Sequence, residues 1–180
     1  MKVIIITCLS ASLVLQVINQ TYSLRNAVMA VIPVIFILAE TLNEDEFQSQ
    51  VTPLISVLFQ LNDRGIRAAL LQRLDSFTGR LDKNAINSTV FEPMCTGFTD
   101  SSGALRELTL KSTIPLIPHL NSVNLEKLGR YLVRLQSDTE NSIRTNTVIF
   151  ISKVRLTSDV HFVVFYLTLF YLLPIRSHLL

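Results

Sequence analysis

Apolar residues in the middle of the sequence recur mostly at steps of three and four positions, the spacing of a helix with one buried side. Arginine and glutamine residues fall between them, on the side expected to face water. A second apolar run precedes each of these stripes, so the pattern predicts pairs of helices joined by a polar turn. The three predicted stripes consist of Ile66, Leu70, Leu74 and Phe77; of Leu105, Leu108, Ile114 and Ile117; and of Ile143, Val148, Ile151 and Val154.

The predicted helix pairs repeat at a nearly constant interval along the chain. An aspartate opens each turn, where its carboxylate can accept hydrogen bonds from the free N–H groups of the next helix. The three residues of this kind are Asp63, Asp100 and Asp138. An aliphatic–arginine pair starts each second helix, and its arginines, Arg67, Arg106 and Arg144, keep nearly the same interval. A weaker fourth copy begins upstream at Leu24-Arg25.

This periodicity predicts an all-α fold, a short HEAT-type helical-repeat solenoid (an α-α superhelix). One pair of amphipathic helices cannot cover its own apolar side, so successive pairs stack into a continuous core. The period lies between those of tetratricopeptide and HEAT units, and the sequence lacks the tryptophan of the former. Pro93, Asp100 and Arg106 follow the HEAT order of proline, turn aspartate and an arginine six residues later.

The same residues predict a structural ladder. We expect each arginine to reach an aspartate of its own turn or of the adjacent turn, through charge-assisted hydrogen bonds. Structural pairing is favoured over ligand capture, because ion pairs of this kind are common on protein surfaces. The unit of Asp63 and Arg67 departs from the pattern, since these two residues are only four positions apart.

Charge is distributed unevenly and divides the chain into three parts. Of its 16 basic and 14 acidic residues, most fall between Glu44 and Arg155. We therefore expect a repeat array at 24–155 between atypical apolar segments at 1–23 and 156–180. The first segment has the composition of a secretory signal peptide, although a partial repeat helix has it too. The apolar run Phe162–Ile175 is shorter than the roughly 20 residues of a membrane-spanning helix.

No motif in the sequence supports catalysis, a cofactor or a metal site. The net charge of +2 is too small for a nucleic-acid-binding surface, so no nucleic-acid partner is expected. Nucleotide-binding loops and kinase motifs are missing. We expect Cys95 to be a small buried hydrophobe and His119 to end a helix. Asn87-Ser88-Thr89 is a glycosylation sequon, relevant if the first segment exports the chain.

From about Ala27 to Val154 the sequence resembles the HEAT-repeat segment of the Scy-like pseudokinases. This resemblance implies a non-catalytic, cytoplasmic and Golgi-associated scaffold for coat-protein-I vesicle traffic from the Golgi to the endoplasmic reticulum. Its partners would be coat or vesicle proteins that meet an exposed helix ridge. The resemblance is carried by VTPLISVLFQLNDRGIRAALLQRLDSFTGRLD, VFEPMCTGFTDSSGALRELTLKSTIPLIPHLN and RYLVRLQSDTENSIRTNTVIFISKV.

Both ends depart from that family, because neither a kinase-like domain nor a basic coat-binding tail is recognisable. We expect residues 156–180 to be a gene-model artefact, since Lys153-Val154-Arg155 fits a splice donor read through into an intron. Two alternatives stay open. One is a secreted or membrane-anchored helical protein with genuine apolar ends, which would provide membrane association. The other is a HEAT-type regulatory subunit of another enzyme.

Overall fold

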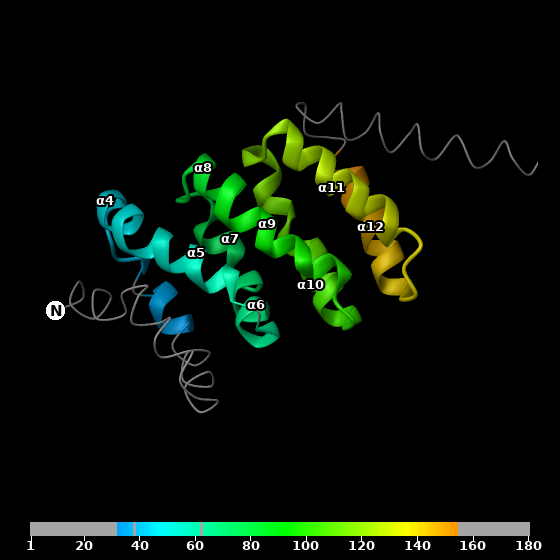
Figure 1. Ribbon diagram of the computed structural model, residues 1–180, viewed down its shortest axis with the longest axis horizontal. Helices are drawn as coiled ribbons and strands as arrows, with labels where there is room; N and C mark the ends of the chain where they lie inside the picture. Colours follow the sequence, from blue (N-terminus) through cyan, green and yellow to red (C-terminus); the bar gives the residue numbers. More distant parts are fainter. Residues whose placement is uncertain (1–31, 38, 62, 155–180) are drawn as a thin grey trace, which may run out of the picture. The chain divides into compact units, whose positions relative to one another are not determined.

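The computed structural model describes residues 32–37, 39–61 and 63–154, and these consist of helices and turns, with no strand among them (Figure 1). The segments predicted at 1–23 and 156–180 lie outside the described residues. Two compact units make up the chain, Met1–Met94 and Cys95–Leu180.

Helices follow one another with short connections throughout the described residues. Residues 32–37 form the first helical stretch. After it come α4 (Glu44–Glu46), η1 (Phe47–Val51), α5 (Thr52–Gln60), α6 (Arg64–Leu71), α7 (Leu74–Thr78), α8 (Lys83–Ala85), η2 (Ile86–Val90), α9 (Phe91–Met94), η3 (Cys95–Thr99), α10 (Gly103–Ser112), η4 (Ile114–His119), α11 (Ser122–Leu135) and α12 (Asn141–Val154).

A polar side chain caps the start of the first helix in each repeat, at equal intervals along the chain. Asn43 accepts a hydrogen bond from the N–H of Glu46, whose carboxylate in turn accepts from the N–H of Asn43. Asp82 and Asn121 accept in the same way from backbone N–H groups of α8 and α11. Such caps satisfy donors that a helix start leaves unpaired. The repeat therefore extends to helix starts that the aspartate and arginine pattern did not include.

Two widened helical turns also recur at the interval of the repeat. The N–H of Thr52 donates to the carbonyl of Phe47, and that of Phe91 donates to the carbonyl of Ile86, five residues earlier in each case. Pro53 follows the first turn and Pro93 the second. Proline lacks an N–H and its ring crowds the carbonyl four residues before it, so a widened turn accommodates it.

In the first unit, α5 packs against α6 on one side and against η2 and α9 on another. The rings of Phe36 and Phe77 stack with their centroids 4.6 Å apart, joining the first helical stretch to α7. All four residues of the first predicted stripe are buried, which confirms that prediction: Ile66, Leu70, Leu74 and Phe77.

In the second unit, α10 packs against η3 and α12, and α12 runs beside α11 (Figure 1). The rings of Phe98 and Tyr131 stack with a centroid separation of 4.9 Å. Gly97 allows η3 to approach α10 closely. A Cβ atom at this position would lie 3.2 Å from Cβ and Cγ2 of the buried Thr109, and closer still to its Oγ1.

The other two predicted stripes are only partly correct. In the second, Leu105 and Ile117 are buried, but Ile114 is 38% exposed. In the third, Ile143 is buried, whereas Val148 is 56% exposed.

Threonines occupy two of the buried positions that these stripes omit. Thr109 and Thr147 are fully buried, and their hydroxyls donate to the carbonyl oxygens of Leu105 and Ile143, at 2.7 Å in both cases. A hydroxyl that is satisfied within its own helix can enter a core, because its polar group is not left without a partner. The third stripe therefore included the exposed Val148 and omitted Thr147 and Phe150, which are buried in α12 together with Ile143.

Candidate protein-interaction surface

The three repeat arginines occupy equivalent positions. Arg67, Arg106 and Arg144 are each the fourth residue of their helix, in α6, α10 and α12. Each helix follows a turn that contains the corresponding aspartate. This equivalence is the one that a stacked helical repeat requires.

Arg106 links two successive turns of the second unit through Asp138. Its Nε donates to Oδ2 at 2.8 Å and its Nη2 to Oδ1 at 2.7 Å. Only 13% of the arginine side chain and 8% of the aspartate side chain are exposed. A forked pair of this kind is stronger and geometrically more specific than a single hydrogen bond. It fixes the start of α10 against the turn before α12.

The forked pair also changes the ionisation of both partners. The hydrogen bonds from Arg106 hold the pKa of the Asp138 carboxyl below its ordinary value, and the backbone N–H of Glu140 adds to this effect. The same carboxylate raises the pKa of Arg106. Both groups are therefore held in their charged forms.

The six-residue spacing of aspartate and arginine closes each turn of the second unit. Arg106 Nη1 donates to the carbonyl of Asp100 at 2.8 Å, and Arg144 Nη1 donates to the carbonyl of Asp138 at 2.6 Å. Each arginine donates to the next carbonyl as well. The two aspartate carboxylates accept from the backbone N–H two residues further on. These arginines therefore pin the turn that leads into their own helix.

Asp63 and Arg67 do not reproduce this arrangement. Asp63 Oδ1 accepts from the N–H groups of Gly65 at 2.9 Å and Ile66 at 3.0 Å, so this residue caps α6 directly. Arg67 is 7% exposed, and its Nε has no hydrogen-bond partner among the described residues. The shorter spacing in this repeat is the sequence feature that distinguishes it.

A second polar cluster joins the faces of α10 and α12. The Glu107 carboxylate accepts hydrogen bonds from Lys111 Nζ, from Ser142 Oγ at 3.1 Å and from Asn146 Nδ2 at 2.9 Å. These donors lower the pKa of Glu107, Lys111 contributing most and Ser142 next. The only acidic side chain of α10 is thus occupied by groups of the protein itself.

An apolar groove lies next to this cluster, and we call it the α10–α12 groove. Its volume is about 220 Å³. Leu110 and Phe150 form its buried floor, while Ile114 and Ile149 are 38% and 46% exposed. The lining is completed by Lys111, Asn146 and Lys153. Exposed aliphatic side chains around a concave surface are typical of a protein-binding site.

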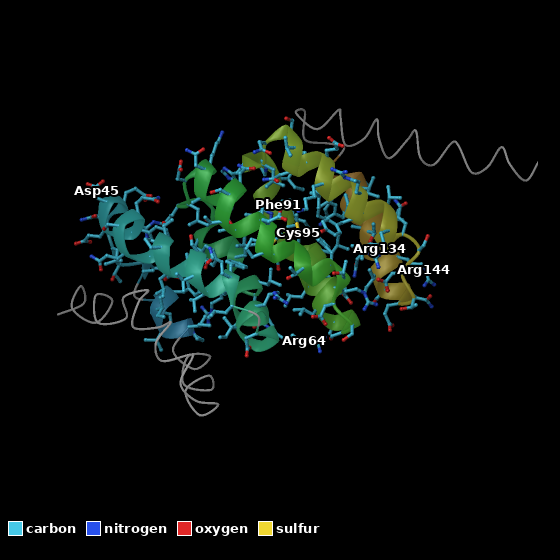
Figure 2. All side chains as sticks on the ribbon, viewed as in Figure 1. Asp45, Arg64, Phe91, Cys95, Arg134 and Arg144 are labelled. Carbon is cyan, nitrogen blue, oxygen red and sulfur yellow. The ribbon has the colours of Figure 1, made fainter. Side chains whose placement is uncertain are left out.

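A larger hollow of about 290 Å³ adjoins the forked pair and is more polar in character. Arg134 lines it near the end of α11, and Figure 2 labels this residue together with Arg144 of α12. Two aspartates and the already paired Arg106 also line the hollow. Because its charges are largely balanced within the protein, it is a weaker candidate than the α10–α12 groove.

Arg80 has a structural role that the sequence analysis missed. Its Nη1 donates to the carbonyl of Ala39 at 2.7 Å, its Nη2 donates to that of Leu42 at 3.0 Å, and its guanidinium lies 4.1 Å from the ring centroid of Phe47. Arg80 thereby holds the end of the first helical stretch against η1. Its main partners are backbone carbonyls, which leave no sequence signature.

The remaining candidates for chemistry do not form a reactive site. Cys95 is 1% exposed and packs as a hydrophobic residue, and His119 ends η4. Across the described residues, His, Cys, Asp and Glu side chains nowhere gather into a group that could hold a metal ion. Nor does any helix in the described ranges have the length and apolar character of a membrane span.

Comparison with known proteins shows what this repeat array is similar to. No family model matches the sequence. Over 117 residues the chain is 30% identical to "Probable inactive serine/threonine-protein kinase scy1" of Dictyostelium discoideum, a match that covers 65% of this chain. The Scy-like resemblance is confirmed. The chain also superposes on the crystal structure of Cex1p, with a TM-score of 0.66 and 32% identity over 80% of this chain.

The second match confirms the predicted fold class, because Cex1p is also a helical-repeat protein. The chain spans only a small part of both relatives, 14% of scy1 and 27% of Cex1p. The name of scy1 describes an inactive kinase, which agrees with a non-catalytic role for the array.

Proposed function

We propose that this chain is a non-catalytic protein–protein scaffold in coat-protein-I vesicle traffic from the Golgi to the endoplasmic reticulum, acting at the cytoplasmic face of the Golgi. The similarity to the inactive kinase scy1 over 117 residues carries this proposal. The trafficking role and its coat-protein partners come from the family that the repeat sequence resembles.

The geometry of the second unit supports a scaffold. The Arg106–Asp138 pair and the Glu107 cluster tie α10 to the turn before α12 and to α12 itself. A helix surface held in this way loses little conformational entropy when a partner binds. The α10–α12 groove provides an apolar contact on that surface.

A capture experiment tests the trafficking role. The tagged 180-residue chain is expressed in cells, and the material bound to it is probed for coatomer subunits. We expect coatomer to be captured and the chain to overlap with a Golgi marker, whereas an unrelated helical-repeat protein with the same tag captures none. Capture of a catalytic enzyme subunit without coatomer would instead support the regulatory-subunit alternative.

The sequon at Asn87 provides an independent test of the compartment. Asn87 lies in η2, and its side-chain amide donates to the carbonyl of Lys83 at 2.7 Å. A protein on the cytoplasmic side of the membrane never meets the enzyme that glycosylates such sites. We expect the chain to migrate identically before and after glycosidase treatment, as the variant Asn87→Gln does. A glycosidase-sensitive shift that this substitution abolishes would support the secretory alternative and contradict our proposal.

A further inference from the structure

The α10–α12 groove combines an apolar interior with a basic rim. Leu110 and Phe150 are almost completely buried beneath it, and Ile114 and Ile149 form partly exposed walls. Its volume of about 220 Å³ is below the roughly 300–1,000 Å³ of sites for small-molecule ligands. The groove therefore fits one or two side chains of a peptide better than a cofactor.

One positive charge at the groove is not balanced. Lys111 and Lys153 both line it, but Lys111 forms an ion pair with Glu107, and the α12 sequence contains no acidic residue. Glu107 is the nearest acid on α10, and its carboxylate already accepts from Lys111, Ser142 and Asn146. Lys153 has no ion-pair partner within the described residues. A ligand that fills the groove consequently meets the positive charge of Lys153 at the rim, beside the neutral Lys111–Glu107 pair.

We propose that the α10–α12 groove binds a short segment of a partner protein in which an aliphatic side chain is flanked by glutamate or aspartate. This inference rests on the proposed scaffold function and specifies the chemistry of its partner. The aliphatic side chain enters between Ile114 and Ile149, and a flanking carboxylate approaches Lys153. Binding to an anionic membrane would require a larger basic cluster than two lysines.

Direct binding of probe peptides to the full 180-residue chain tests this assignment. The probe is a fluorescein-labelled peptide with two adjacent leucines and two glutamates on each side of them. In one control peptide glutamines replace the glutamates, and in the other serines replace the leucines. We expect saturable binding of the probe by fluorescence anisotropy, weakening with added salt, and affinities at least about fivefold lower for both control peptides.

Variants of the chain locate the binding site. Lys153→Glu replaces attraction by repulsion at an exposed position and is expected to weaken probe binding about tenfold. Ile149→Asp should weaken it at least as much, because it places a carboxylate in the apolar wall. Val148→Asp is the matched control. Val148 is the adjacent residue, is 56% exposed and does not line the groove, so its substitution should leave binding unchanged.

Several outcomes would overturn the assignment. These are equal binding of the glutamine peptide, equal weakening by Val148→Asp, and Lys153-dependent binding to phosphatidylserine vesicles in preference to the probe. If the chain captures coatomer but ignores the probe peptide, the groove assignment fails and the scaffold proposal stands. If the chain neither captures coatomer nor binds the probe peptide, the scaffold proposal and the groove assignment both fail. Circular dichroism of Lys153→Glu, whose substitution is at an exposed helix end, separates lost binding from lost folding.

Discussion

Arg106 makes the most concentrated set of polar contacts in the second unit. One guanidinium holds a carboxylate of the following turn through two donors and a carbonyl of its own turn through a third. Arg144 has the equivalent contacts with its own turn, but no carboxylate partner is present among the described residues. Comparing the two arginines therefore separates two contributions to stability. One comes from closing the arginine's own turn, and the other from the ion pair between successive turns.

We expect Arg106→Ala to lower the free energy of unfolding by about 2 kcal/mol, because it leaves the mostly buried Asp138 carboxylate without its main partner. Arg144→Ala loses only bonds to carbonyls and should cost about 1 kcal/mol. Urea denaturation of both variants provides the comparison. Combining Arg106→Ala with Asp138→Ala should cost clearly less than the sum of the single changes, since one interaction is removed twice. Additive costs would show that the pair contributes no coupling.

The carboxyl groups of Asp138 and Glu107 make stability depend on acid pH. Both have pKa values below their ordinary ones in the folded chain, because Arg106 and Lys111 respectively donate to them. They bind protons more weakly when folded, so their contribution is present above their ordinary pKa values of about 4 and disappears as the pH falls below that range. The urea midpoint should therefore decrease from pH 6 to pH 3. Asp138→Asn should reduce this slope, with Glu107 supplying part of the remainder, and an unchanged slope would contradict the assignment.

At the scale of elements, the close approach of η3 and α10 depends on one missing side chain. Gly97→Ala would press a Cβ atom into Thr109, which is fully buried and hydrogen-bonded to Leu105. We expect a loss of about 1–3 kcal/mol, the usual cost of overpacking, measured by thermal denaturation. Gly129→Ala in α11 is the control. No heavy atom outside the local helix lies within 4 Å of the added Cβ, so higher helix propensity should stabilise the chain slightly.

Thr109→Ala provides a further check on this contact. Removing its hydroxyl and methyl groups relieves most of the overlap with the Cβ of Gly97→Ala. The double variant should consequently lose less stability than the two single changes added together. If the double variant loses as much stability as the two single variants together, the contact between η3 and α10 is not the cause of the destabilisation.

The elements themselves were predictable from sequence to the extent that their buried residues are apolar. Ile66 and Leu70 marked the buried side of α6 correctly. The buried side of α12 was partly misread, because the predicted stripe took the exposed Val148 in place of its polar neighbour Thr147, which is fully buried. A threonine satisfied by its own helix looks polar in the sequence and behaves as a small apolar residue in the fold.

At the scale of the whole molecule, the repeat interval could be recognised in the sequence because helix starts and turns require specific side chains. Aspartates and asparagines that cap, and arginines that close turns, keep their spacing whatever the intervening residues are. The contacts of Arg80 with distant carbonyls and the α10–α12 groove depend instead on which helix faces meet. No local sequence pattern predicts which helix faces pack together. The Arg80 contacts and the groove could therefore be found only in the structure.

The division into two compact units implies that destabilisation stays local. In repeat arrays stability is approximately a sum of unit and nearest-neighbour contributions. Arg106→Ala should therefore reduce the hydrogen-exchange protection of amides in α10 and α12, while amides of α5 change little. Leu70→Ala, a large-to-small change at a fully buried position of the first unit, should give the reciprocal result. Hydrogen–deuterium exchange with mass spectrometry resolves these segments. Equal loss of protection throughout the chain with either variant would mean that the array unfolds as one cooperative body, and the additive description would then not apply to it.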